Sequence, residues 1–219
     1  MIEYDKDAIV YPYITSFIRG EIPKRQGIFG ELSEYAEKNS IPIVQPETAK
    51  LLEVLSAAKR PKRILEVGCA IGYSALLMAQ YLADGGSITT LEWDADMAEL
   101  ARENIERAGL SDKITVIQND AKETLPKLTG EYDIIFLDGP KAHYIYMLND
   151  CIRLLNKGGI LISDNVLYKG MTADDEHVIR RKITIVKRLR RFISAQMQRD
   201  ELETAILPLG DGVTVSVKK

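Results

Sequence analysis

Residues 63–74 read RILEVGCAIGYS, a short apolar run followed directly by a loop that holds two glycines. The run has the length and the apolar character of a buried strand in a parallel sheet. The loop opens a helical stretch that begins near Tyr73. In α/β proteins, ligands bind beyond the carboxyl ends of such strands. This stretch therefore predicts an α/β fold and places a candidate binding site at the loop.

The sequence on the C-terminal side of this stretch continues the alternation. Apolar runs predict further strands at Ser87–Glu92, Lys113–Gln118, Tyr132–Asp138 and Gly159–Asp164, with helices near 73–83, 95–108, 121–128, 144–156 and 175–197. Two last strands, Glu203–Pro208 and Gly212–Lys218, are separated by a turn short enough for a hairpin. We therefore expect a doubly wound, Rossmann-like sheet of seven strands, mostly parallel, with an antiparallel last strand.

The residues before this core have a different pattern. Residues 1–60 read as helical, with breaks near Gly20–Pro23 and Ile41–Pro42, and Pro46 occupies a favoured first helical position. A chain of 219 residues fits one domain. We therefore predict a single domain over 1–219, in which residues 1–60 form a helical cap and residues 61–219 form the α/β core.

Composition excludes several classes of protein. The formal charge of −3 argues against wholesale electrostatic capture of nucleic acid, although it allows a local basic face. The two cysteines lie far apart, which makes a disulfide framework or a structural zinc site improbable. The N-terminus lacks the pattern of a signal peptide, and no apolar stretch approaches the ~20 residues that span a bilayer. The expected compartment is the cytoplasm, with no membrane partner.

The polar residues at three successive strand ends indicate the cofactor. The glycine loop is not GxGxxG, and Glu66 lies two positions before Gly68, where its negative charge would repel a diphosphate. Such an anion suits a cofactor that presents a cation and an amino group. Glu92 is placed to accept ribose hydroxyls, and Asp120 and Ala121 to bind an adenine ring. With Gly68 and Gly72, these residues predict a site for an adenosine that carries a cationic tail, although any one acid could instead be a helix cap.

Two further strand ends carry oxygen ligands. Asp138 follows one predicted strand, and Asp164 and Asn165 follow the next. If these strands are neighbours, two carboxylates and one amide oxygen converge. All-oxygen ligation favours Mg²⁺, Mn²⁺ or Ca²⁺, and so few protein ligands leave positions open for a substrate. We therefore predict a catalytic divalent-cation site, the alternative being two ordinary loop acids.

These motifs resemble a known family. The glycine loop and the strand-end acids look like the class I S-adenosylmethionine methyltransferases. Asp138-x-x-Lys141-x-x-Tyr144 with Asp164-Asn165 looks like their cation-dependent O-methyltransferases of the catechol and caffeoyl-CoA type. The resemblance implies that Asp138, Asp164 and Asn165 bind the metal and that Lys141 accepts the hydroxyl proton. It also places Val44, Ser74 and Asp138 around the cofactor and implies a homodimer.

A basic segment bears on the substrate. Residues 180–191 carry seven basic residues and no acid, with Ile179, Ile183, Val186 and Ile193 at helical spacing. The predicted RNA-contacting residues are Arg180, Arg181, Lys187, Arg188, Arg190 and Arg191. This segment, residues 164–170 and residues 204–212 resemble the bacterial tRNA 5-hydroxyuridine methyltransferases. The resemblance implies methylation of 5-hydroxyuridine to 5-methoxyuridine at the wobble position of the tRNA anticodon loop.

Alternatives to this interpretation stay open. A small-molecule catechol or phenolic O-methyltransferase would share every proposed active-site residue. A non-catalytic RNA-binding module that keeps the fold is a second alternative. The basic segment can also be a solvated helix face, and Lys141 can supply charge only, with the metal alone activating the hydroxyl. A nicotinamide dehydrogenase is disfavoured because the third glycine of its fingerprint is missing.

Overall fold

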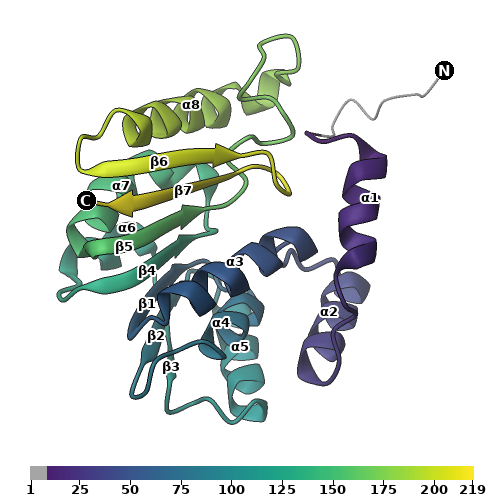
Figure 1. Cartoon of the computed structure of the whole chain (residues 1–219), viewed down its shortest axis with the longest axis vertical. Helices are drawn as coiled ribbons and strands as arrows, with labels where there is room; N and C mark the ends of the chain where they lie inside the picture. Colours follow the sequence, from purple (N-terminus) through teal and green to yellow (C-terminus); the bar gives the residue numbers. More distant parts are fainter. Residues whose placement is uncertain (1–8) are drawn as a thin grey trace.

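The computed structural model describes residues 9–219 and builds them into one seven-stranded sheet with helices on both faces (Figure 1). The strands are β1 (Arg63–Val67), β2 (Ser87–Glu92), β3 (Ile114–Gln118), β4 (Tyr132–Leu137), β5 (Leu155–Ser163), β6 (Leu202–Leu207) and β7 (Val213–Lys218). The α-helices are α1 (Pro12–Glu21), α2 (Ile28–Asn39), α3 (Pro46–Lys59), α4 (Tyr73–Ala79), α5 (Ala95–Arg107), α6 (Ala121–Thr124), α7 (Tyr144–Leu154) and α8 (Ile183–Met197). Three short 3-10 helices are η1 (Leu125–Lys127), η2 (Lys141–His143) and η3 (Arg180–Lys182).

The strand order is β3-β2-β1-β4-β5-β7-β6. Strands β1 to β5 pair in parallel, whereas β7 pairs antiparallel with both β5 and β6. The predicted sheet, including the antiparallel last strand and the pairing of β4 with β5, is confirmed. The chain reverses its direction of winding between β1 and β4, and this switch point is where ligands bind in such sheets.

Two hydrophobic cores lie on opposite faces of the sheet because successive strand residues point to opposite sides. Ile64, Ile134 and Phe136 pack on one face, with residues of α2 to α5. Leu65 and Leu137 pack on the other face, with residues of α7 and α8. The central strands β1 and β4 are buried on both sides, as predicted for a covered parallel sheet, whereas β3 and β6 at the two edges are partly exposed.

The helix predicted over 175–197 is shorter than expected. α8 begins at Ile183, and the residues before η3 form turns. The Asp174 side chain accepts a hydrogen bond from the backbone N–H of Glu176 and pairs with the His177 ring, and such local side-chain bonds compete with helix formation. The buried face of α8 accordingly consists of Val186, Leu189 and Phe192, while the predicted members Ile179 and Ile183 are exposed.

Other sequence expectations concern single features. Both cysteines are free and buried, as predicted. β5 begins at Leu155, four residues before the predicted start, because a register irregularity near Tyr132 and Ile134 lets it pair with β4 earlier. Within residues 9–219, no helix has both the length and the apolarity to cross a bilayer.

Candidate active site

A cleft of about 690 Å³ opens at the carboxyl ends of the central strands. Its walls come from the segment before α3, the β1 loop, and the ends of β2, β3, β4 and β5. The predicted residues that line it are Val44, Gly68, Ser74, Glu92, Asp120, Ala121, Asp138, Lys141, Asp164 and Asn165. The sheet therefore brings the predicted cofactor and metal residues to one place, with the exceptions of Glu66 and Gly72.

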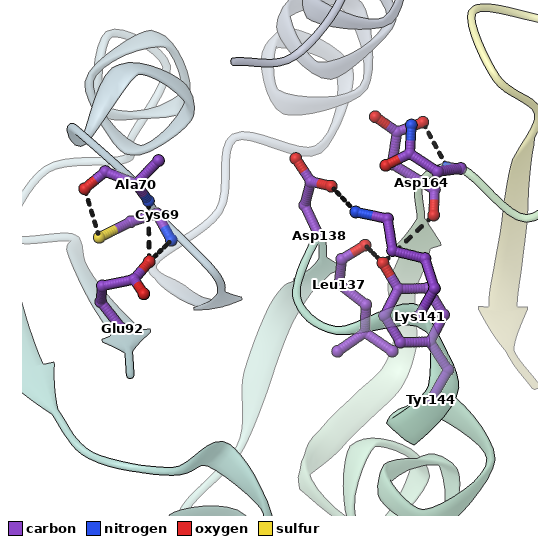
Figure 2. Close-up of polar contacts among 9 residues, drawn as sticks. Cys69, Ala70, Glu92, Leu137, Asp138, Lys141, Tyr144 and Asp164 are labelled. Atoms are coloured by element: carbon purple, nitrogen blue, oxygen red, sulfur yellow. Dashed lines mark hydrogen bonds and ion pairs between the residues drawn. The ribbon is translucent and has the colours of Figure 1, made fainter. Parts of the chain in front are cut away.

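The glycine loop is held by Glu92 rather than open to a diphosphate. Glu92 Oε2 accepts the backbone N–H of Cys69 at 3.1 Å and of Ala70 at 2.9 Å (Figure 2). Its other oxygen accepts the N–H of Asp94 at 3.0 Å. Because a carboxylate satisfies these loop amides, they do not form the free anion cradle of a dinucleotide site. Glu92 keeps further lone pairs toward the cleft, as a ribose-binding acid needs.

Gly68 joins the β1 loop to the β4 loop by direct backbone contact. Its φ is +87°, and a Cβ at this position would lie 2.6 Å from the Asp138 carbonyl oxygen. Gly72, at φ +84°, caps α4 and closes a turn through its N–H to Cys69 O at 2.7 Å. Gly72 thus shapes the loop and is not among the residues that line the cleft, so its predicted place at the cofactor stays a prediction.

Replacing Gly68 with alanine is expected to lower the free energy of unfolding by about 2–4 kcal/mol, since the new Cβ meets backbone and the left-handed φ strains any side chain. Urea unfolding monitored by circular dichroism measures this change. Gly20→Ala is the control, because a Cβ there meets nothing within 4 Å. Equal stabilities of the two variants would contradict the close approach of the loops.

Glu66 lies beneath the glycine loop and is fully buried. Thr90 Oγ1 donates to Glu66 Oε2 at 2.6 Å, while Oε1 has no hydrogen-bond partner among residues 9–219. Burial raises the pKa of Glu66 to about 7, against the opposing effect of the Ser74 and Thr90 hydroxyls. Glu66 is not among the residues that line the cleft, and its side chain supports the loop from below, so its predicted role toward the cofactor stays a prediction.

The raised pKa of Glu66 gives a pH-dependent stability. Between the unfolded value of 4.5 and the folded value of about 7, the folded state binds more protons, so the free energy of unfolding falls as pH rises. The loss from this residue amounts to roughly 3 kcal/mol by pH 8. Glutamine does not ionise, so the Glu66→Gln variant should not show this pH-dependent loss of stability. Urea unfolding of both proteins from pH 5 to pH 8 measures the difference, and parallel curves would contradict the burial of an ionisable Glu66.

Asp120 and Ala121 begin α6. Asp120 Oδ1 accepts the Lys122 N–H at 2.8 Å, and Lys122 Nζ lies 3.4 Å from Oδ2. Asp120 is therefore a helix N-cap, the alternative weighed from sequence, and it also lines the cleft. The two interpretations hold together because one carboxylate can accept several hydrogen bonds.

The oxygen ligands meet at the ends of β4 and β5. Figure 2 shows Lys141 rising between Asp138 and Asp164, with Lys141 Nζ 2.9 Å from Asp138 Oδ1. Asp164 is 1% exposed, and its Oδ1 accepts the Asn165 N–H at 2.7 Å. Burial, followed by repulsion from Asp138, raises the pKa of Asp164.

The donor set fits a hard divalent cation. Among the described residues no three His, Cys, Asp or Glu side chains form a metal cluster, so the set requires the Asn165 amide as its third donor. Each carboxylate has a second oxygen beyond the one bound to Lys141 or to the backbone. Two carboxylates and one amide are ligands that Mg²⁺, Mn²⁺ and Ca²⁺ accept.

A family model described as O-methyltransferase matches residues 23–219. The chain belongs to this O-methyltransferase family. The matched residues include the cleft and every strand of the sheet. The relatives below include catechol and caffeoyl-CoA O-methyltransferases, so the resemblance inferred from the motifs, to the cation-dependent class I enzymes, is confirmed at the level of the family.

The curated relatives are similar to this chain over different parts of its length. The caffeoyl-CoA O-methyltransferase of Populus kitakamiensis is 30% identical over 222 residues, covering 94% of this chain and 90% of that protein. The catechol O-methyltransferase of Niastella koreensis is 35% identical over 136 residues, covering 60% of this chain. The chain spans 62% of the length of that protein and 66% of the catechol O-methyltransferase of Mycobacterium tuberculosis.

Solved structures of O-methyltransferases share the fold. The Bacillus cereus O-methyltransferase in complex with SAH has a TM-score of 0.83 and 26% identity, covering 94% of this chain and 97% of that one. A methyltransferase from Podospora anserina, also SAH-bound, has a TM-score of 0.85 and 26% identity, covering 94% of each chain.

Two residues that the sequence analysis gave no role support the end of the cleft where Asp138 and Asp164 lie. The buried Tyr144 hydroxyl donates to Leu137 O at 3.0 Å and lies 3.2 Å from Asp164 O, so it ties the ends of β4 and β5 together. Asp211, in the β6–β7 turn, adds negative charge near Asp164. The spacing of Tyr144 in the quoted motif was a usable signal, whereas Asp211 reaches the site only through the fold.

Other lining residues were also missed. Trp93 lines the cleft although 70% of its surface is exposed, and His143 lines it from η2. Burial lowers the pKa of His143, and the nearby cations Lys122 and Arg188 lower it further. Trp93 directly follows Glu92, and His143 lies two residues after Lys141. These positions were the available signal, because residues close to a strand end lie at the same rim.

The predicted RNA-contacting residues fall into two groups. Arg190 donates to Thr172 O at 2.8 Å and to Met171 O at 3.1 Å, and its guanidinium pairs with Asp175. These bonds fasten α8 to the preceding loop, which argues against the predicted RNA contact of Arg190. Arg180, Arg181, Lys187 and Arg191 are exposed, whereas Arg188 is half-buried and lies over the ring of Tyr146.

Proposed function

We propose that this chain transfers a methyl group from S-adenosylmethionine to a hydroxyl that has a second oxygen beside it. The observation that carries the proposal is the cluster of Asp138, Lys141 and Asp164 inside the cleft that Gly68, Ser74 and Glu92 also line. A cofactor-binding wall and a set of oxygen ligands thus face one cavity, as transfer to an oxygen nucleophile requires.

Different residues of the cleft would have different roles in the reaction. A divalent cation held by Asp138, Asp164 and Asn165 would supply Lewis acidity that lowers the pKa of a chelated hydroxyl. Lys141, whose Nζ lies 2.9 Å from Asp138 Oδ1, would take the hydroxyl proton. Val44, Glu92 and Asp120 would orient the cofactor, and the apolar walls from Ile43 and Met147 would keep water from the reacting atoms.

The substrate that this proposal favours is 5-hydroxyuridine in the anticodon loop of tRNA, whose 5-hydroxyl and 4-carbonyl are adjacent oxygens. Support comes from the basic residues of η3 and α8 and from Lys122 at the cleft. Basic side chains beside a reaction site suit a substrate with a phosphate backbone.

A small-molecule catechol or phenolic substrate is the second candidate. The observation that favours it is the set of curated relatives, which are named as catechol and caffeoyl-CoA O-methyltransferases. Catechol also presents two adjacent oxygens, and it would need none of the basic surface.

The test uses the purified chain with S-adenosylmethionine and Mg²⁺. tRNA bearing 5-hydroxyuridine should yield 5-methoxyuridine, detected by mass spectrometry of the nucleosides, and chelation of the cation should stop the reaction. Turnover on catechol with no product on this tRNA would reject the RNA substrate and keep the methyl-transfer chemistry. No turnover on either substrate, with S-adenosylmethionine bound, would favour a non-catalytic RNA-binding module.

We further propose that the chain acts as a homodimer. α1 has no buried residue, and its aromatic residues Tyr13 and Phe17 are 62% and 68% exposed. Aromatic side chains exposed together are typical of protein interfaces. Light scattering after size exclusion should give twice 24.6 kDa, and Phe17→Ser should shift the mass toward one chain.

A further inference from the structure

A cationic rim, formed by Lys122, His143, Tyr146 and Arg188, borders the cleft next to Lys141. Lys122 and His143 line the cleft itself. Tyr146 lies on α7 and Arg188 on α8, and these helices pack against each other, while α8 also packs against η2. The rim thus combines α6, the consecutive elements η2 and α7, and the more distant α8 at one side of the reaction site.

Within the rim, Tyr146 supports Arg188. The Arg188 guanidinium lies 5.3 Å from the centroid of the Tyr146 ring, a cation–π arrangement. Tyr146 is 58% exposed although it is a large aromatic side chain. An arginine held against an aromatic face loses less conformational freedom when it binds a planar or tetrahedral anion, because its fork is already oriented.

The charge of the rim is incompletely neutralised. No carboxylate of residues 9–219 lies within ion-pair distance of Arg188, whereas Arg190, two residues on, is paired with Asp175. Lys122 has Asp120 as its partner, at 3.4 Å. The positive charges of Lys122 and Arg188 both lower the pKa of the His143 imidazole, so the three side chains lie near one another.

We propose that the cationic rim binds a phosphodiester of the RNA beside the nucleotide whose base enters the cleft, with Arg188 as the principal contact and Tyr146 as its positioning residue. The inference rests on the proposed function. Phosphate recognition by a stacked arginine accounts for the exposed aromatic residue, for a guanidinium without a carboxylate partner among residues 9–219, and for the packing of α8 against η2 beside the cleft. Phosphates of a coenzyme A thioester share this chemistry, and the test separates the two sources.

The experiment measures kcat/KM with three methyl acceptors: an anticodon stem-loop RNA that carries 5-hydroxyuridine, the free nucleoside 5-hydroxyuridine, and caffeoyl-CoA. Arg188→Ala should lower kcat/KM for the RNA by roughly tenfold and leave kcat/KM for the free nucleoside unchanged. It should also make the salt dependence shallower by about one unit in the log–log slope, since one phosphate contact is lost.

The positioning role has its own comparison. Tyr146→Leu should reproduce part of the loss on RNA, mainly in KM, whereas Tyr146→Phe should retain wild-type values because it keeps the ring. Arg102→Ala is the matched control. Arg102 is an exposed arginine on α5, which lies away from α8 in Figure 1, and within the described part of the chain its partners are Glu99 and the Val116 carbonyl. Unchanged affinity for S-adenosylmethionine by calorimetry shows that each variant is folded.

The outcomes are distinguishable. Wild-type turnover on the RNA with no loss in Arg188→Ala would overturn the rim and leave the proposed function intact. An equal loss on RNA and nucleoside, or a loss confined to caffeoyl-CoA, would also overturn it. Absence of wild-type turnover on the RNA would overturn the proposed RNA substrate and the rim with it.

Discussion

Asp138→Asn is expected to lower kcat/KM for methyl transfer at least about a hundredfold at saturating Mg²⁺, and its dependence on the cation should shift to higher concentration. Asp138 lies at the contact between the two halves of the site, because its backbone touches Gly68 and its carboxylate binds Lys141. Removing its charge weakens the proposed cation site and releases Lys141 at once. Turnover against Mg²⁺ concentration, with direct cation binding by calorimetry, measures both effects.

The control for Asp138 is Asp150→Asn on α7. Asp150 has a similar side-chain exposure, 25% against 20%, and a similar ion pair with a basic residue three positions later. It lies outside the cleft, so its loss should change kcat/KM less than about twofold, as expected for partly exposed pairs. Equal effects of the two substitutions would contradict a role for Asp138 in the reaction.

Lys141→Met should lower kcat by about 10²–10⁴-fold with little change in KM, the range for removal of a general base. Lys141 is half-buried at the end of the cleft where the cation site is proposed, with its amine 2.9 Å from Asp138. Single-turnover rates with pre-bound S-adenosylmethionine and Mg²⁺ measure the chemical step without product release.

Lys141→Arg separates a base from a simple positive charge. Arginine keeps the charge but does not give up its proton at physiological pH, so a proton acceptor would be lost in both variants. Rescue of the rate by arginine would show that Lys141 only supplies charge. A loss below about tenfold in Lys141→Met would assign activation of the hydroxyl to the cation alone.

Much of the fold was predictable from sequence because local pattern and global topology agree. The short, mainly apolar run Arg63–Val67 is typical of a strand in a covered parallel sheet, and Ile64, Leu65 and Val67 are buried there. Once β4 and β5 are adjacent, Asp138 and Asp164 must follow the same edge, so the order of the strands is enough to bring the metal candidates together. Lys141 lies only three residues after Asp138, so a single turn of the chain brings its amine to the Asp138 carboxylate.

The rest depended on contacts between distant segments. The sequence places Glu66 at a strand end, but its side chain points under the loop toward Thr90 of the neighbouring strand, which only the register of β1 with β2 decides. Arg190 looks like any other basic residue of its helix until Thr172 and Met171 are folded against it. The start of α8 was missed because the side chain of Asp174 caps a turn locally.

The absence of a side chain at Gly68 has an evolutionary consequence. The segment that would hold the methyl donor and the segment that would hold the acceptor's metal touch through bare backbone, so neither can drift without the other. Selection for new acceptors in this lineage therefore has little freedom at the floor of the cavity. We expect homologues that use other acceptors to differ mainly in the peripheral helices, while the spacing between the methyl-donor site and the proposed metal site stays constant.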